Sequence, residues 1–259
     1  MSPMSDDLAS LKSLVQTSGV ATVNVVAWRD LDDPEAGGSE LHADEIFKRW
    51  AAAGVTIEMR TSAVPGRAAR VDRNGYAVNR TGGRYKVFPS VIFRGIFGRC
   101  SKRPDGVVEI WNGMPFLSPL WHRGRRLVLL HHVHGEMWQM TLPGLLGRLG
   151  WLIEHRLAPP FYRRTMIATL SKSSAEEIEH RMHLHRVAVV PPGIAPAFEP
   201  GVERAETPLV VAVGRLVPVK RFDLLIESFI EVRKQVPSAH FVIIGEGYLR
   251  TELEDLIAD

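Results

Sequence analysis

Gly37 and Gly38 lie between an apolar run and a segment with the apolar spacing of a helix. Successive glycines let a backbone approach a ligand closely, and a helix N-terminus offers amide groups and partial positive charge. We expect Ser39 to cap this helix. Such a corner suits a phosphate group, although a tight turn before a capped helix explains the same residues without a ligand.

Arg215 and Lys220 flank a second turn, GRLVPVK, which also follows a predicted strand and precedes a predicted helix. Arginine holds an anion with a planar fork, and lysine contributes a compact charge. Two cations beside a helix N-terminus suit a diphosphate. The alternative is a solvated basic loop, which the flanking strand and helix make the weaker interpretation.

A third turn of this kind consists of Gly245, Glu246 and Gly247. Its glycines would let the backbone approach a nucleotide. The turn is not a dinucleotide-binding fingerprint, because that motif needs a third glycine at a set spacing. We therefore treat these three residues as candidate nucleotide contacts.

Three histidines, His131, His132 and His134, close a predicted apolar strand at 127–133. In an open α/β sheet, ligands bind at the carboxyl ends of the strands. Alternation places His132 and His134 on one face and His131 on the other. Two histidines could share a metal ion, but no cysteine or third ligand lies nearby in the sequence. We therefore expect no metal site, a substrate contact from His134 and a structural role for His131.

Short strands alternate with longer helices along the chain, which indicates βαβ units and a mostly parallel sheet. The predicted strands are 22–28, 55–61, 76–79, 107–111, 127–133, 166–170, 187–190, 209–213 and 240–244. The predicted helices are 40–53, 173–182, 221–235 and 248–258. The arginine-rich segment 65–84 is expected to be a loop around one short strand. The arginines of 63–84 either contact an anionic or membrane-bound acceptor or belong to a solvated, flexible loop.

The domain organisation follows from this pattern. We expect an N-terminal tail at 1–20, a first Rossmann-type domain at 21–195, a proline-containing linker at 196–208 and a second Rossmann-type domain at 209–259. The second unit is shorter than a usual doubly wound domain, so we expect it to be partial.

The composition is that of an ordinary globular protein, with 45% hydrophobic and 24% charged residues in 259. A net charge of +3 is too small to indicate nucleic acid, and it fits a phosphorylated partner or an anionic membrane surface. The single cysteine, Cys100, excludes an intrachain disulfide and is expected to be incidental. No signal peptide or run of about 18 apolar residues is visible. We expect a cytoplasmic protein, with peripheral contact at the inner face of the membrane left open.

Taken together, the motifs resemble the retaining GT-B glycosyltransferases of family GT4, from about Val23 to the end of the chain. The resemblance rests on GGSE at 37–40, NGMPF at 112–116, IATLSKSS at 167–174, VVPPGIAPAFEP at 189–200, VGRLVPVKRFDLLIESF at 213–229 and the run 241–256 with its GEG turn. In the crossover segment, Pro192 replaces the common asparagine. The order and spacing of these motifs are more specific than any one of them.

The resemblance implies transfer of a sugar from a nucleotide-diphosphate sugar to an acceptor hydroxyl, with retention and without a metal ion or a bound cofactor. It implies that Arg215 and Lys220 contact the donor diphosphate, and that His134 lies near the reacting sugar. The acceptor would be a glycan, a lipid-linked molecule or a small molecule. A phosphorylase or epimerase of the same fold is an alternative, but a phosphorylase would need a cofactor lysine or phosphate site that no motif here indicates.

One departure from the family pattern concerns the Glu-x7-Glu element that holds the donor's sugar and ribose. Glu246, Glu252 and Glu254 do not form such an element. The expectation is therefore that this chain by itself has little transferase activity. The alternative from another class is a catalytically inactive module that binds a nucleotide sugar or a glycan.

Overall fold

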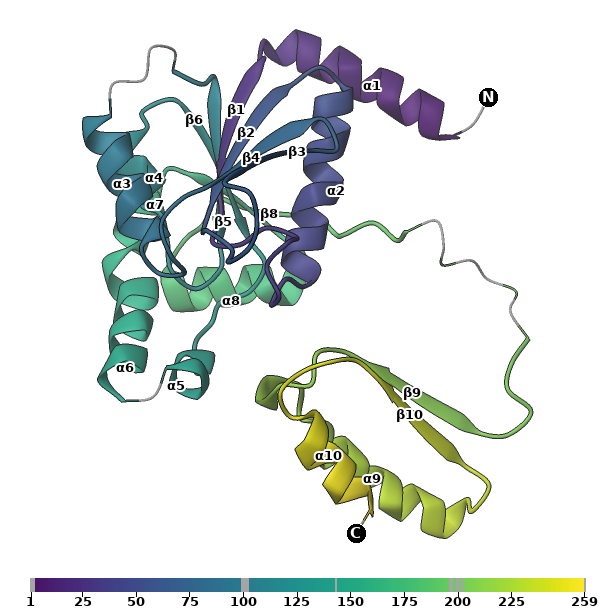
Figure 1. Ribbon diagram of the computed structural model, residues 1–259. Helices are drawn as coiled ribbons and strands as arrows, with labels where there is room; N and C mark the ends of the chain where they lie inside the picture. Colours follow the sequence, from purple (N-terminus) through teal and green to yellow (C-terminus); the bar gives the residue numbers. More distant parts are fainter. Residues whose placement is uncertain are drawn as a thin grey trace. The chain divides into compact units, whose positions relative to one another are not determined.

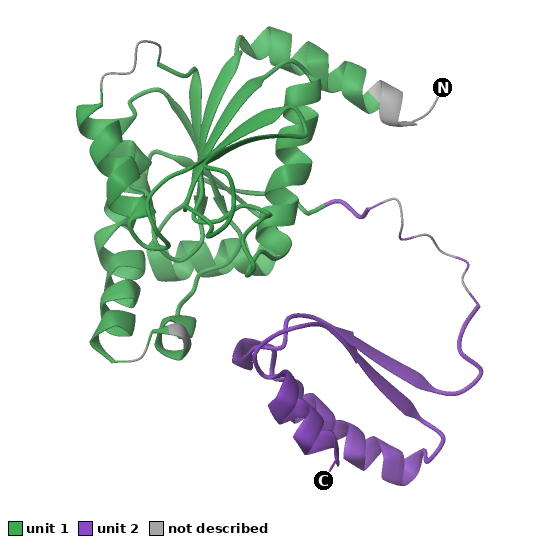
Figure 2. Ribbon diagram, viewed as in Figure 1, with its two compact units in different colours: residues 1–192 green, residues 193–259 purple. Residues whose placement is uncertain are grey.

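The computed structural model describes residues 3–98, 103–142, 144–195, 198, 201 and 203–258. Cys100 and part of the expected linker, 196–208, lie outside these residues. The chain forms two compact units, Met1–Pro192 and Gly193–Asp259, which are coloured separately in Figure 2.

The described residues of unit 1 contain eight strands in one sheet, in the order β3-β4-β2-β1-β5-β6-β7-β8. All neighbouring pairs are parallel except β3 with β4. The strands are β1 (Thr22–Val26), β2 (Thr56–Thr61), β3 (Arg70–Arg73), β4 (Tyr76–Arg80), β5 (Gly106–Trp111), β6 (Arg125–Leu130), β7 (Met166–Thr169) and β8 (Val187–Val189). Parallel strands share one carboxyl edge, so the loops after β1, β5 and β6 gather there.

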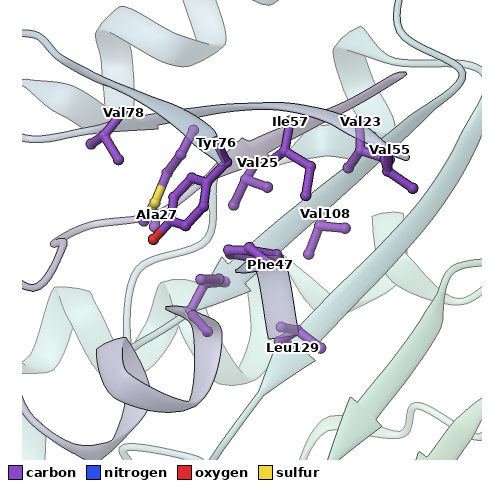
Figure 3. Packing of buried hydrophobic residues seen from close by; sticks show 13 residues of the cluster. Val23, Val25, Ala27, Phe47, Val55, Ile57, Tyr76, Val78, Val108 and Leu129 are labelled. Atoms are coloured by element: carbon purple, nitrogen blue, oxygen red, sulfur yellow. The ribbon is translucent and has the colours of Figure 1, made fainter. Parts of the chain in front are cut away.

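Helices cover both faces of this sheet (Figure 1). The helices are α1 (Pro3–Ser18), α2 (Gly38–Ala52), α3 (Val87–Phe97), α4 (Ser118–Trp121), α5 (Met137–Thr141), α6 (Leu145–Leu152), α7 (Pro159–Tyr162) and α8 (Lys172–Met182), and a π-helical turn (Ile153–Leu157) follows α6. On one face, Phe47 of α2 packs among Val25, Ile57 and Val108, as Figure 3 shows. The other face carries two further clusters, built with residues of α3, α7 and α8.

Two segments of unit 1 differ from the sequence-based expectation. The expected tail at 1–20 contains α1, and Val15 of this helix packs against the core shared with α2. The expected loop at 65–84 contains the hairpin β3–β4. The polar strand β3 is held by antiparallel pairing and by ion pairs from Arg73 to Asp30 and Asp32, which are contacts that local sequence does not reveal.

Within the described residues, unit 2 consists of a parallel strand pair, a crossover helix between the two strands and a second helix after them. Its elements are β9 (Leu209–Val213), a 3-10 turn (Pro218–Lys220), α9 (Phe222–Gln235), β10 (His240–Ile244) and α10 (Arg250–Ala258). The two strands have the predicted bounds, because each is a compact apolar run between clear turns. Leu216, Phe222, Ile226 and Leu253 form its buried core. Among the described helices of both units, none has the length and hydrophobicity that a membrane crossing requires.

Candidate functional site

The Gly37–Gly38 corner follows β1 and begins α2. Gly37 itself occupies the N-cap position in an extended conformation, so the prediction that Ser39 caps the helix is wrong. The amide of Gly37 donates to Glu40 Oε2 at 2.8 Å, and the Ser39 hydroxyl donates to the same oxygen at 2.9 Å. A Cβ atom built on Gly38 would meet no heavy atom within 4 Å. The backbone at Gly38 is therefore open to an approaching group, as the corner hypothesis requires.

A buried ion cluster holds the loop that leads into this corner. Arg80 donates to both carboxylate oxygens of Asp30, from Nε at 2.8 Å and from Nη2 at 2.9 Å. Arg73 pairs with the same carboxylate at 3.1 Å. Burial alone would raise the pKa of Asp30, but the hydrogen bonds from Arg80 and the Asp32 amide outweigh it and lower the pKa. The hairpin β3–β4 thus anchors the loop after β1 through charge-assisted bonds.

Arg29 is a buried cation at the same corner, and the sequence analysis did not identify it. Its guanidinium lies 4.3 Å from the ring centroid of Trp28, and its Nη1 donates to Glu35 Oε2 at 3.0 Å. Its Nε lies 3.9 Å from Glu40 Oε1, at the N-terminus of α2. A single arginine after a strand gives no sequence signal of its own, whereas the fold places it beside the Gly37–Gly38 corner.

The histidines follow the end of β6, which closes at Leu130, so the predicted strand at 127–133 is too long. His131 Nε2 lies 3.1 Å from Nδ1 of His42 on α2, which joins the loop after β6 to the helix after β1. The rings of His132 and His134 stack at 4.7 Å with an interplanar angle of 20°. The two rings therefore share one side, as the alternation predicts, although they do so beyond the strand.

The loop that carries His134 is fastened to a buried carboxylate. Glu154, on the π-helical turn, accepts from the His134 amide at 3.0 Å, the Gly135 amide at 3.3 Å and Trp138 Nε1 at 2.8 Å. Its side chain is fully buried. Gly113, with φ of +80°, leaves room for this arrangement, because a Cβ there would lie 3.1 Å from both His134 Nε2 and the Trp138 ring. Glu154 was not predicted as a site residue, although an acidic residue directly after the largely apolar stretch LLGRLGWLI is a usable signal.

The electrostatic environment keeps two of these histidines neutral. Burial, with His132 and Arg29 nearby, lowers the pKa of His134 to about 3. Burial, with His42 and His132 nearby, lowers the pKa of His131 to about 4. A neutral imidazole can donate one hydrogen bond and accept another, as recognition of a hydroxyl group requires. Across the described residues, no three His, Cys, Asp or Glu side chains gather as a metal-binding group.

The second predicted site lies at the carboxyl ends of β9 and β10 in unit 2. Arg215 and Lys220 are both exposed, and Lys220 ends the 3-10 turn before α9. The Gly245–Gly247 turn packs directly on this loop: a Cβ on Gly245 would lie 1.9 Å from Gly214 O, and one on Gly247 would lie 2.2 Å from Leu216 O. The side chain of Glu246 is exposed and pairs with Arg250 at 2.8 Å.

The glycines of this turn therefore have a structural function, which is to let two loops meet. Leu216 N donates to Glu246 O at 2.9 Å, and Gly214 N donates to Ile244 O at 3.0 Å, so backbone bonds join the same two loops. The fold brings Arg215, Lys220 and the Gly245–Gly247 turn together at the carboxyl ends of β9 and β10. It likewise brings Gly37, Gly38 and the histidines to one edge of unit 1.

Two Rossmann-type units of this kind define the GT-B class of fold. Solved structures of glycosyltransferases superpose on the chain and support this fold class. The crystal structure of TarM superposes with a TM-score of 0.62 at 11% identity, covering 92% of this chain and 74% of that one. The catalytic domain of starch synthase IV from Arabidopsis thaliana, bound to ADP and acarbose, gives 0.57 at 12% identity and covers 92% and 71%. At such identities the likeness shows the fold alone.

The family follows from sequence models. The model described as Glycosyltransferase Family 4 matches residues 36–198, and the model described as Glycosyl transferases group 1 matches residues 196–259. This chain belongs to Glycosyltransferase Family 4. It is 31% identical over 166 residues to a GDP-mannose-dependent alpha-(1-6)-phosphatidylinositol monomannoside mannosyltransferase of Mycolicibacterium smegmatis. The match covers 56% of this chain and 41% of that protein, so the chain spans about two fifths of the length of this relative.

Proposed function

We propose that the chain is part of a retaining glycosyltransferase that moves a sugar from a nucleotide-diphosphate sugar to an acceptor hydroxyl, without a metal ion or a bound cofactor. The observation that carries the proposal is the carboxyl edge of unit 1, where the open Gly38 backbone, the buried Arg29 and the neutral His134 lie on adjoining loops. Membership of a glycosyltransferase family supports it.

The proposed donor site in unit 2 acts on the leaving group. As the glycosidic bond to the donor breaks, negative charge grows on the diphosphate, and groups that bind this charge lower the barrier. Arg215 and Lys220 lie on one loop before the N-terminus of α9, whose dipole adds to their charge. Two side-chain cations and a helix dipole would supply the stabilisation that other enzymes obtain from a bound metal ion.

The proposed function of His134 is to orient a sugar hydroxyl. Its low pKa means that the ring carries no charge at neutral pH, so it can donate one hydrogen bond to a sugar hydroxyl and accept another. The Gly37–Gly38 backbone would approach the donor phosphate or the acceptor, with Arg29 nearby as a fixed positive charge.

The proposal is tested by following the product of the reaction directly. The complete enzyme is incubated with donor sugars on different nucleotide diphosphates and with candidate acceptors, and the anomeric signal of the product is observed by NMR from the first turnover. We expect the anomeric configuration of the donor in the product, with the same rate in the presence of EDTA. Inverted product, or loss of turnover with EDTA that added metal restores, contradicts the mechanism. Donor binding without any turnover supports the alternative of a binding module.

A further inference from the structure

Helix α6 exposes its leucines and buries its glycines. Leu145 and Leu146 are 81% and 63% exposed, and Leu149 and Leu152 are 47% and 40% exposed. We call these four residues the leucine face. Leu145, Leu149 and Leu152 have the spacing of residues on one side of a helix. In a helix of a globular domain this side normally faces the core.

The packing of α5 against α6 fixes this orientation. A Cβ atom on Gly147 would lie 2.1 Å from Leu142 O, and one on Gly150 would lie 2.5 Å from the Trp138 ring. Gly147 and Gly150 are both buried, so the helix makes its close contact through the side that has no side chains. Any rotation that buried the leucines would lose this contact. The fold of unit 1 therefore holds the leucine face at the surface of that unit.

The surroundings of the leucine face are apolar and basic. Other large apolar side chains near it in the sequence are also exposed, namely Met140, Trp151, Leu157 and Phe161. Along the same helical stretch, the exposed charged side chains are Arg148 of α6 and Arg156 of the π-helical turn, and the one exposed carboxylate in the described part of 136–157 is Glu136. Leucines and tryptophan with flanking arginines are the composition of a helix that lies in the membrane interface.

We propose that the leucine face inserts into the surface of a membrane that contains anionic lipid, with Arg148 and Arg156 contacting the lipid phosphates. The charge distribution favours this occupant over a second copy of the chain, because a symmetric contact would bring the same arginines of two copies together. This inference goes beyond the proposed function, and lipid binding requires neither donor nor acceptor.

The test is co-sedimentation of the 259-residue chain with vesicles, without any sugar nucleotide. Neutral vesicles contain phosphatidylcholine alone, and anionic vesicles contain added phosphatidylglycerol. We expect tighter binding to the anionic vesicles. Leu149→Asp should weaken it by about tenfold to a hundredfold, the loss expected for one buried leucine side chain. Leu14→Asp, at an exposed leucine of α1, is the matched control and should bind as the parent chain does.

The arginine contribution is tested separately. Arg148→Glu should weaken binding to anionic vesicles by roughly tenfold or more, since each basic residue near an anionic surface contributes about 1 kcal/mol. It should leave binding to neutral vesicles unchanged, and Arg233→Glu in unit 2 should change neither. Circular dichroism confirms that each variant is folded. The proposal is overturned if Leu149→Asp and Leu14→Asp bind equally, or if light scattering shows a dimer that Leu149→Asp dissociates while vesicles bind neither form.

Discussion

Replacing Glu154 by glutamine tests whether a buried carboxylate fastens the loop of His134. Burial raises the pKa of Glu154 to about 7, against 4.5 for an ordinary glutamate, although the amides of His134 and Gly135 and the indole of Trp138 donate to it. Between these two values, the folded chain keeps a proton on Glu154 that the unfolded chain has already released. The free energy of unfolding therefore falls as the pH rises from about 4.5 to about 7.

The magnitude follows from the difference between the two pKa values. Each unit corresponds to about 1.4 kcal/mol, so a difference of about two and a half units amounts to about 3 kcal/mol over the whole interval. Glutamine has no charge at any pH, so Glu154→Gln should remove this dependence. Near pH 5 it should also lower stability by about 1–2 kcal/mol, because an amide oxygen cannot accept from all three donors. Relative to Glu154→Gln, the free energy of unfolding of the parent chain should fall by about 2 kcal/mol between about pH 5 and about pH 8.

The assay is denaturant unfolding at several pH values, followed by tryptophan fluorescence. All six tryptophans lie in unit 1, so the signal reports the unfolding of that unit alone. Glu58→Gln, at an exposed glutamate of β2, is the control and should keep the pH dependence of the parent chain. The titratable groups near Glu154 are the rings of His134 and His155 and the carboxylate of Glu177, which also raises the pKa of Glu154. If Glu154→Gln has the same pH dependence as the parent chain, the burial argument is refuted.

Three further predictions concern the two candidate sites. Lys220→Ala should weaken binding of the donor nucleotide by roughly tenfold to a thousandfold, because it removes a charge-assisted bond of about 1.5–4 kcal/mol. Calorimetry measures this binding. The control Lys234→Ala, at an exposed lysine of the same unit, should bind the nucleotide as the parent chain does. His134→Ala should lower turnover in the complete enzyme by about tenfold to a hundredfold while the melting temperature stays near that of the parent. His131→Ala should do the reverse, since it removes a ring contact that joins the loop after β6 to α2. Gly245→Ala should destabilise unit 2 by about 1–3 kcal/mol, seen as faster hydrogen exchange in β9 and β10, because its Cβ would collide with a backbone oxygen.

The strands were the most predictable part of the fold. β9 and β10 have the predicted bounds, and β1, β2, β5, β7 and β8 differ from prediction by one or two residues at an end. Each is a buried or compact apolar run next to turn residues, and such runs carry their own signal. By contrast, β3 is polar, and it depends on pairing with β4 and on ion pairs to a loop some 40 residues away, which no local pattern encodes.

The candidate site was predictable in its loops and not in its supporting residues. The Gly37–Gly38 corner and the histidines were found because glycines and histidines at strand ends are visible in a sequence. Arg29 and Glu154 were missed because their importance comes from burial and from partners up to 20 residues away. The N-cap was assigned wrongly because Ser39 has the favoured side chain, whereas Glu40 already satisfies the Gly37 amide.

The two glycine turns show why identical residues can have different functions. At Gly38 a side chain would meet open space, whereas at Gly245 and Gly247 it would collide with the backbone of the neighbouring loop. Glycine is thus required at the second turn by packing alone, and a ligand need not be invoked to explain it. In the proposed donor site, the phosphates would then be held by the side chains of Arg215 and Lys220. The Gly245–Gly247 turn would fix the loop that presents these two cations, so its replacement should affect donor binding and the stability of unit 2 together.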